Sequence, residues 1–188
     1  EDYINTQEEL YKDLKKEFNN DLKSWNAQID STKLSIRFLV PDDYKVNSPK
    51  IFFNPGSSVL TNYGEKILND FFPRFRKIIY RYKNSVEELR IEGHTSSDWI
   101  GLNENRAYYN NMKLSQDRTR NVLEFTLESV QDADEKAWFR EYLSSNGLSS
   151  SKVIKDSLGI EDYIASRRVE FRIKTRAEES LRKINKLK

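Results

Sequence analysis

The sequence contains no cysteine, and this absence excludes both a disulfide framework and any metal site built on thiolates. One histidine is present, so the chain has no ligand spacing typical of zinc sites, and we expect neither a metal nor another cofactor. No apolar run is long enough to cross a bilayer. The net charge is only +2, with no basic face interleaved with aromatic residues, which argues against a nucleic-acid partner.

Bulky apolar residues are nevertheless well represented. Charged residues make up 33% of the chain and hydrophobic residues 37%, but ten Tyr, ten Phe and three Trp supply enough large side chains for a packed core. A length of 188 residues fits one domain with short appendages. The sequence has no signal peptide and does not begin with Met, so we interpret it as a soluble piece of a longer protein.

The N-terminal residues carry a helical pattern, which predicts a helix from residue 3 to about residue 29. Thr6 followed by Glu9 is typical of a capping box. The apolar stripe recurs about every fourth residue, at Leu10, Leu14, Phe18, Leu22, Trp25 and Ile29. Such a helix either packs on the domain or forms a stalk or dimer seam near a membrane. We therefore assign residues 1–32 to a helical linker or stalk.

The remaining pattern predicts an α+β or α/β fold, with helices covering a small mixed sheet. We expect a domain over residues 33–175 and a charged helical tail over residues 176–188. Strands are predicted over 34–40, 51–53, 86–92, 151–154 and 168–175, and helices over 61–82, 114–129 and 133–145. Residues 41–50 are expected to be a loop, and the polar stretch from 92 to 113 a long loop that contains a short helical turn. Pro73 predicts a kink or break in the second helix, Ser115 a helix N-cap, and Asn146-Gly147 a helix end.

The stretch EGHTSSDW, residues 92–99, contains the histidine together with hydroxyl side chains and an acid. His94, Ser96 and Asp98 could be taken for a hydrolytic triad. Residues this close along one loop rarely reach triad geometry, and no nucleophile elbow is present. We expect no catalysis and predict that His94 hydrogen-bonds within its own loop.

Five motifs occur in a characteristic order: IEGHT at the end of a strand, Asn111 three residues before Leu-Ser, LSQDR opening a helix, NGLSSSKV, and RRVEFRI. Over roughly residues 34–175 the chain resembles the OmpA-like peptidoglycan-binding domain shared by OmpA, Pal and MotB. The LVPD and FNPGSSVLT segments are more similar to the MotB-type branch. The segments GHTSSDW, LSQDRTRNVL and GLSSSKV are also similar to the MotB-like subunit of Zorya anti-phage defence systems.

The resemblance implies an OmpA-like α+β domain whose groove grips the diaminopimelate residue of the peptidoglycan stem. This residue carries a free ammonium and a free carboxylate, so the site needs an anion and a cation. The family's cation is the Arg of LSxxR, here Arg118, which we expect in the first turn of a helix where the N–H groups also favour an anion. Asn111 and Leu114 match the family's loop Asn and apolar wall, and Thr95 belongs to the same site.

The anion is where this chain departs from the family pattern. The family has Asp directly after GHT, whereas Ser96 stands here, with Asp98 two residues further. Either Asp98 receives the ammonium or the site has lost its acid and binds differently; we favour Asp98. Asn54 is a further candidate through backbone or amide hydrogen bonds. Arg167 and Arg168 precede the last strand, where the residues predict structural pairing and the resemblance implies proximity to the groove.

The function implied is a non-enzymatic cell-wall anchor that binds the diaminopimelate stem peptide of peptidoglycan. In a longer protein it would hold an ion-driven stator complex and its membrane partner subunit against the wall. We expect a homodimer in the periplasm, as the periplasmic domain of an inner-membrane-anchored protein. The alternative is a dimerising periplasmic scaffold that has the fold but does not bind peptidoglycan; the displaced acid supports this alternative.

Overall fold

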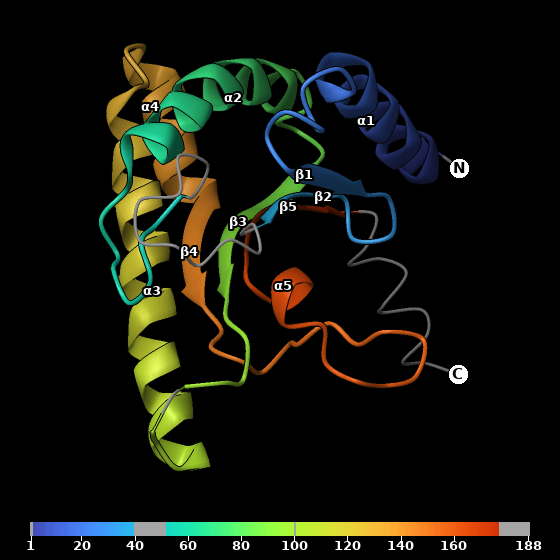
Figure 1. Cartoon of the computed structure of the whole chain (residues 1–188). Helices are drawn as coiled ribbons and strands as arrows, with labels where there is room; N and C mark the ends of the chain where they lie inside the picture. Colours follow the sequence, from blue (N-terminus) through green and yellow to red (C-terminus); the bar gives the residue numbers. More distant parts are fainter. Residues whose placement is uncertain (1, 40–51, 100, 177–188) are drawn as a thin grey trace.

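The computed structural model describes residues 2–39, 52–99 and 101–176 (Figure 1). The elements follow in the order α1 (Asp2–Phe18), β1 (Ala27–Asp30), β2 (Ser35–Leu39), α2 (Asn62–Arg81), β3 (Val86–His94), α3 (Glu104–Glu128), α4 (Ala133–Tyr142), β4 (Leu143–Gly147), α5 (Tyr163–Ser166) and β5 (Arg168–Thr175). No helix in these ranges is long and apolar enough to cross a membrane. The expected loop over 41–50 and all but the first residue of the tail fall outside the described residues.

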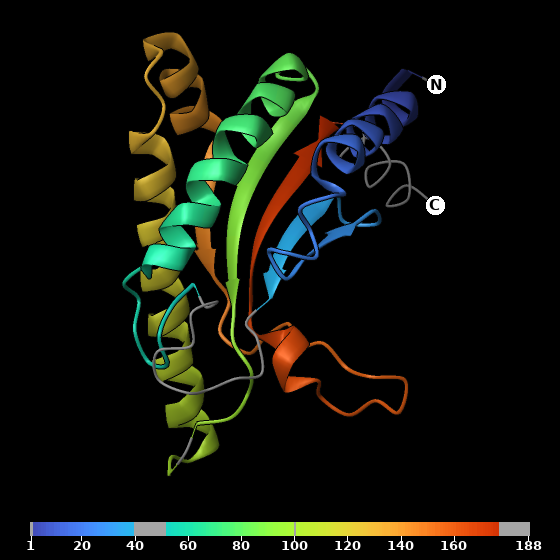
Figure 2. The same ribbon diagram turned by 45° about the horizontal axis from the view of Figure 1, so that its top comes forward.

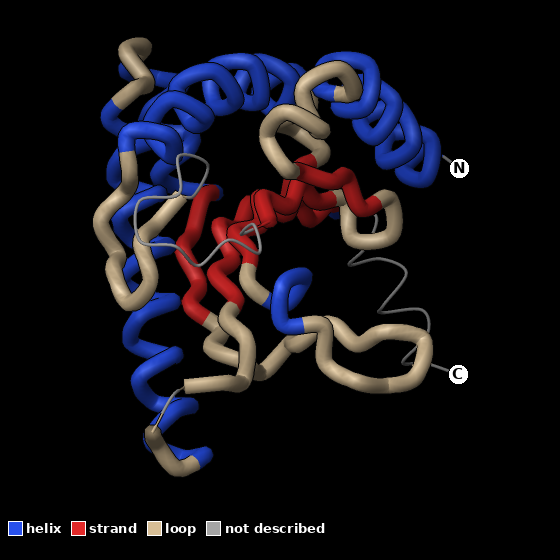
Figure 3. The backbone as a smooth tube through the Cα atoms, in the orientation of Figure 1, coloured by secondary structure: helices blue, strands red, loops and turns tan. Residues whose placement is uncertain are grey.

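The strands form one five-stranded mixed sheet in the order β1-β2-β5-β3-β4, which confirms the α+β prediction. Only the β3–β4 pair is parallel, and the other three pairs are antiparallel. Figure 3 shows helices α1 to α4 along one side of the sheet, and the loops that follow β3 and β4 gathered near one end of it. These loops contain the residues of the candidate site.

The two faces of the sheet differ sharply in chemistry. Along β5, Val169, Phe171 and Ile173 alternate with charged residues, as predicted from the sequence. Phe171 lies opposite Ile36 on β2 and Ile91 on β3, so the apolar residues of three strands share one face. Helices α1 to α4 cover this face (Figure 2). The opposite face carries Glu92, Glu170 and the arginines that accompany them.

Helix α2 confirms the predicted span and carries much of the core. Thr61 caps it by accepting a hydrogen bond from the Gly64 N–H, and Phe71, Phe72 and Phe75 are buried in it. Of the predicted kink or break at Pro73, the break is wrong, because the helix continues through that residue. An interior proline costs about 3 kcal/mol, and the buried rings on both sides of it offset this loss by packing on the sheet.

The N-terminal helix is shorter than predicted and packs on the domain. It ends at Phe18, and residues 27–30 form the edge strand β1 instead of a last helical turn. Asn26 adopts a positive φ of 50°, which turns the chain into β1, and Asn is among the few residues that tolerate this conformation. Leu10, Leu14 and Phe18 are fully buried. Of the two alternatives, these residues therefore show the packed helix, and the boundary placed at residue 32 falls between two paired strands.

Helix α3 begins at Glu104, ten residues before the predicted start. Asn103 is its N-cap and accepts a hydrogen bond from the Arg106 N–H, whereas Ser115 lies within the helix. Of the loop expected over 92–113, residues 92–94 therefore belong to strand β3 and residues 104–113 to helix α3. The buried stripe of this helix was hidden in the sequence because most of its members are small or polar: Ala107, Asn111, Ser115, Thr119, Val122 and Thr126.

The strand after α4 was also placed wrongly by the sequence. Residues 143–147 pair with β3 as the parallel strand β4, and residues 151–154 are not a strand. Gly147 therefore ends a strand rather than a helix. Phe53 does form β-type pairing, as an isolated bridge to Leu60. Strand β4 lies beside α3, and this pairing brings α3 over the ends of β3 and β4.

Candidate ligand site

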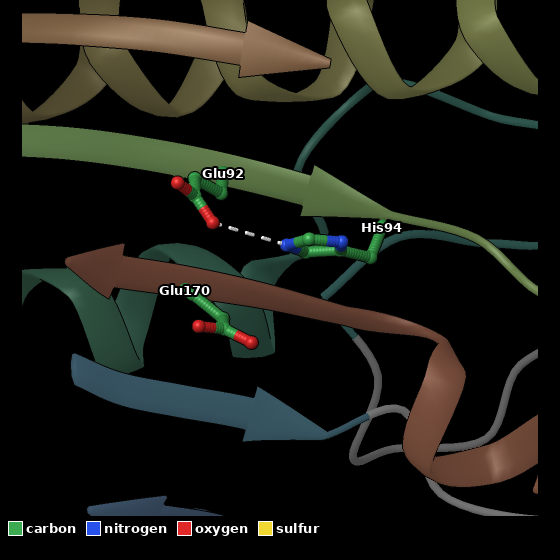
Figure 4. A group of neighbouring side chains, drawn as sticks. All are labelled: Glu92, His94 and Glu170. Carbon is green, nitrogen blue, oxygen red and sulfur yellow. Dashed lines mark hydrogen bonds and ion pairs between the residues drawn. The ribbon is translucent and has the colours of Figure 1, made fainter. Parts of the chain in front are cut away.

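A buried charge network occupies the polar face of the sheet at the end of β3. His94 Nε2 lies 3.3 Å from Glu92 Oε2 on the same strand, and Glu170 lies opposite Glu92 on β5 (Figure 4). His94 therefore bonds within its strand, not within the following loop as predicted. Arg168 Nε donates to Glu170 Oε1 at 2.5 Å, and Arg37 Nε lies 3.0 Å from the same oxygen.

The arginines keep these carboxylates ionised. Burial by itself raises the pKa of Glu170, but the hydrogen bond from Arg168 and the charges of Arg168 and Arg37 outweigh it, so the pKa lies below its ordinary value. Burial likewise raises the pKa of Glu92, and His94 with the more distant arginines brings it below the ordinary value. Both carboxylates are therefore charged at neutral pH.

Glu92, His94 and Glu170 have the donor atoms of a metal site, since one ligand atom from each lies within 4.8 Å of the others. The surrounding charge does not fit a cation. Glu170 is bonded to Arg168 and paired with Arg37, and Glu92 has arginine nitrogens at 3.8 and 4.0 Å. Asp30 and Glu88 also pair with Arg37 and Arg90, so the carboxylates of this network already have cationic partners, which a metal ion would have to displace. The trio belongs to a structural network.

This network predicts an acid-sensitive step in stability. Burial lowers the pKa of His94, and the hydrogen bond to Glu92 offsets this only in part. In the unfolded chain the pKa is about 6.5, so below that pH the unfolded state binds a proton more readily than the folded state. The free energy of unfolding should fall as pH drops from about 6.5, by at most about 1.4 kcal/mol per pH unit.

Denaturant unfolding of wild type and His94→Gln between pH 7.5 and 5.5 measures this step. The variant has no imidazole to titrate, so its free energy of unfolding should be nearly flat over this range. Carboxyl groups with lowered pKa values destabilise both proteins only at more acidic pH. Parallel slopes for the two proteins above pH 5.5 would show that His94 is not responsible.

Arg118 is a charged group held by backbone carbonyl groups. Its Nε donates to the Ser57 carbonyl at 2.8 Å and its Nη2 to the Asn54 carbonyl at 3.1 Å, and its guanidinium lies 4.9 Å from the Phe53 ring centre. No carboxylate within the described ranges pairs with it. Burial lowers the pKa of Arg118 to about 10, so the side chain stays protonated at neutral pH.

Arg118 borders a small cavity at the end of the sheet. The cavity measures about 20 Å3, room for roughly one water molecule. Its polar lining comes from His94, Thr95, Ser115, Arg118 and Arg168, and Phe38, Phe52 and Phe53 are among its apolar residues. His94 Nδ1 and Thr95 Oγ1 are buried and make no hydrogen bond to any described residue. The cavity therefore brings uncompensated polar groups beside an uncompensated cation.

Asp98 lies in a separate cluster with Ser96 and Arg167. Arg167 Nη2 donates to both Asp98 carboxylate oxygens at 2.9 Å, and its Nε donates to Ser96 Oγ at 2.6 Å. Ser96 Oγ in turn donates to Asp98. The Asp98 side chain is 49% exposed. It does not line the cavity, so the structure does not bring Asp98 and Arg118 together around one space.

The other predicted site residues have distinct positions. Thr95 and Arg118 share the cavity, and Asn54 contributes its backbone carbonyl to Arg118. Asn111 is buried and its amide donates to the Ser96 carbonyl at 3.1 Å, so it holds the loop. Leu114 is partly buried on α3 and does not line the cavity.

The expectation that Arg118 lies in the first turn of a helix is wrong. Since α3 begins at Glu104, Arg118 is the fifteenth residue of that helix, where the backbone N–H groups are already bonded to preceding carbonyls. The helix N-terminus therefore adds nothing at this position. Any attraction for an anion comes from the guanidinium itself. Sequence reasoning also missed that Arg167 pairs with Asp98, although Arg167 had been placed near the groove.

Comparisons with known proteins agree with this architecture. No protein-family model matches the chain. Over 183 residues it is 42% identical to the Zorya protein ZorB of Escherichia coli, and the match covers 97% of this chain and 74% of ZorB.

Two solved structures are similar in fold. A MotB-like protein from Desulfovibrio vulgaris has a TM-score of 0.63 at 20% identity, covering 93% of this chain and 98% of that one. The cell wall anchor of the T6SS from Pseudomonas aeruginosa has a TM-score of 0.53 at 17% identity, and the match covers 86% of this chain and 96% of that one. The expected OmpA-like, MotB-type fold is confirmed.

Proposed function

The chain belongs to the family of the Zorya protein ZorB, and from this premise we propose that it is a non-catalytic module that anchors an inner-membrane stator-type complex to the cell wall. The ligand is the peptide stem of peptidoglycan, bound through its diaminopimelate residue. The module works in the periplasm as part of a homodimer, and a membrane partner subunit completes the ion-driven complex. The similarity in fold to a cell wall anchor and to a MotB-like protein supports this proposal.

The observation that carries the proposal is the guanidinium of Arg118, which pairs with no carboxylate in the part of the chain that the structure describes. A partly buried cation without a counter-ion is costly, and a ligand carboxylate would compensate it with charge-assisted hydrogen bonds. Arginine also suits a carboxylate better than lysine because its planar fork can donate two parallel bonds. Thr95 Oγ1 and His94 Nδ1 lie in the lining of the same cavity and could add hydrogen bonds to the bound group.

The ammonium of the diaminopimelate side chain is assigned to Asp98. This carboxylate is half exposed, so an ammonium can reach it from solvent. Ser96 stands at the position of the family's acid and directs its hydroxyl to Asp98. Asn111 fixes the backbone of this loop through the Ser96 carbonyl. Leu114 supplies partly buried apolar surface on α3, in the position of the family's apolar wall.

A catalytic role has no support in this geometry. The hydroxyl of Ser96 is bonded to Asp98 and Arg167, whereas His94 is bonded to Glu92. A hydrolytic triad requires the histidine to contact the nucleophilic hydroxyl. These contacts fit a binding site whose charged groups are held in fixed positions.

A second candidate function is a dimerising scaffold that does not bind the wall. One observation favours it: Asp98 is already neutralised by Arg167 and does not share the cavity of Arg118. A scaffold would keep the fold and its packed core but would have no affinity for peptidoglycan. The two candidates therefore differ in one measurable property.

Sedimentation with purified sacculi distinguishes them. We expect the wild-type chain to pellet with sacculi and Arg118→Ala to lose at least about 30-fold in affinity, since removing one partner of a buried charge pair costs about 2 kcal/mol or more. The matched control is Arg120→Ala, because Arg120 lies on the same helix but its side chain is 69% exposed. Thermal unfolding checks that each variant is folded.

Three outcomes are informative. Loss of pelleting for Arg118→Ala alone supports the proposed site. Equal pelleting of wild type, Arg118→Ala and Arg120→Ala would place wall binding elsewhere on the chain. Wild-type protein that stays in the supernatant would favour the scaffold.

A further inference from the structure

Arg167 is paired with Asp98, the acid of the proposed site. Its Nη2 lies 2.9 Å from each oxygen of Asp98, and its Nε is bonded to Ser96, whose hydroxyl also contacts the acid. The only carboxylate assigned to the ligand ammonium is thus already paired with a cation of the protein. An ammonium that approaches Asp98 meets a neutralised group and a guanidinium of like charge.

Contacts other than those of Arg167 also hold the loop that carries Asp98. The Thr95 N–H donates to the Ser149 carbonyl at 2.9 Å, and Asn111 donates to the Ser96 carbonyl at 3.1 Å. Glu161 accepts hydrogen bonds from both the backbone N–H and the hydroxyl of Ser97, at 2.9 and 2.5 Å. These contacts hold residues 95–97 on three sides without any contribution from Arg167.

The solvent exposure of the Arg167–Asp98 pair would allow a ligand cation to displace Arg167 from the carboxylate. The Asp98 side chain is 49% exposed and the Arg167 side chain 17% exposed, so the carboxylate keeps a face toward solvent. The solvent screens the exposed side of this carboxylate, which leaves room there for a second cation. A ligand cation that arrives on a peptide already held at Arg118 can therefore replace Arg167 or share the carboxylate.

We propose that Arg167 is a specificity-determining residue that occupies, in the unliganded protein, the place on Asp98 that the ligand ammonium takes. This inference rests on the proposed function, because it concerns the second half of the same site. With Arg167 in place, Arg118 and the ligand carboxylate supply most of the affinity, and the ammonium adds little. Removing the charge of residue 167 makes the site recognise a zwitterionic amino acid more strongly.

The test uses the whole chain and two synthetic ligands. One is a stem tripeptide that ends in diaminopimelate, and the other is the same tripeptide with the side-chain ammonium acetylated. Calorimetric titration of wild type should give similar affinities for the two, within about threefold. Arg167→Gln should bind the unmodified tripeptide about three- to tenfold more tightly than wild type and should not gain for the acetylated one.

Two further variants distinguish an Arg167 that competes with the ligand ammonium from an Arg167 that only positions Asp98. Arg167→Lys keeps the positive charge and should show no gain, whereas Arg167→Gln combined with Asp98→Asn should lose the gain entirely. A residue that only positions Asp98 would give weaker binding in Arg167→Gln and partial rescue in Arg167→Lys, and that pattern overturns the inference. Thermal unfolding of each variant confirms that the loop region remains folded.

The two proposals fail in different ways. If wild type and all variants bind neither tripeptide nor sacculi, the proposed function itself is wrong. If wild type binds but Arg167→Gln binds the unmodified tripeptide equally or less well, the function stands and only the role of Arg167 is rejected.

Discussion

Replacing Phe71 with alanine is expected to lower the free energy of unfolding by about 3–5 kcal/mol. Phe71 is fully buried. The centre of its ring lies 4.9–5.2 Å from the ring centres of Phe18, Phe38 and Phe171. These neighbours belong to α1, β2 and β5, and Phe71 itself belongs to α2. The substitution would leave a cavity where four elements meet, and surrounding rings cannot collapse into it without moving helices.

Denaturant unfolding of Phe71→Ala and of Phe125→Ala measures this effect. Phe125 is only partly buried at the edge of the core, so its replacement should cost clearly less. The total stability of a domain is about 5–15 kcal/mol, so the Phe71 variant should lose a large share of it and unfold at a clearly lower denaturant concentration. Equal losses for the two variants would mean that the core is not organised around Phe71.

Replacing Gly147 with alanine should destabilise the chain by about 3 kcal/mol, at the upper end for overpacking. A Cβ at this position would lie 2.3 Å from the backbone nitrogen of Gln116 and 2.6 Å from its Cα. Both atoms belong to the backbone of α3, so no side-chain rotation relieves the clash. Helix α3 must move away from β4, and it carries both Arg118 and Asn111.

The expected result of Gly147→Ala therefore has two parts, a lower unfolding midpoint and weaker binding to sacculi. Asn146→Ala is the matched control, because Asn146 lies on the same strand and its amide donates to Ser144 within that strand. This control tests whether alanine is tolerated in β4 in general. A Gly147→Ala protein as stable as wild type would contradict the close approach of α3 to β4.

The elements predicted well from the sequence are those whose burial depends on large apolar side chains. Strand β5 alternates between apolar and charged residues, and α2 repeats its aromatic residues at helical spacing, so both were placed within a residue or two. The first half of α3 was missed because its buried face is made of Ala107, Asn111 and Ser115, which look polar in sequence. Their small size is what allows the helix to lie close to the glycines of β3 and β4.

Strand β4 was missed for a related reason. Its sequence, LSSNG, has one large apolar residue, and the helical pattern of α4 runs directly into it. A parallel edge strand of this kind is defined by pairing with β3, which lies some fifty residues earlier in the chain. Local sequence patterns carry no information on such a partner.

The site was predictable in its residue types but not in its pairing. Arg118 and Thr95 were identified from motifs, and both border the same cavity. The sequence could not identify the partner of Asp98, because Arg167 lies 69 residues further along the chain. The two residues meet only because the segment after β4 folds back toward Asp98. The carbonyl groups that hold Arg118 are equally distant in sequence.

The central claim is that the guanidinium of Arg118 receives a carboxylate of the peptidoglycan stem. Titrating protein labelled with nitrogen-15 in its arginine side chains with the diaminopimelate tripeptide measures this directly, with Arg118→Lys used to assign the Nε–H resonance. The account predicts a saturable shift of the Arg118 resonance at one equivalent of peptide, and none when the peptide carboxylates are amidated. An unshifted Arg118 resonance in a protein saturated with the tripeptide would contradict it.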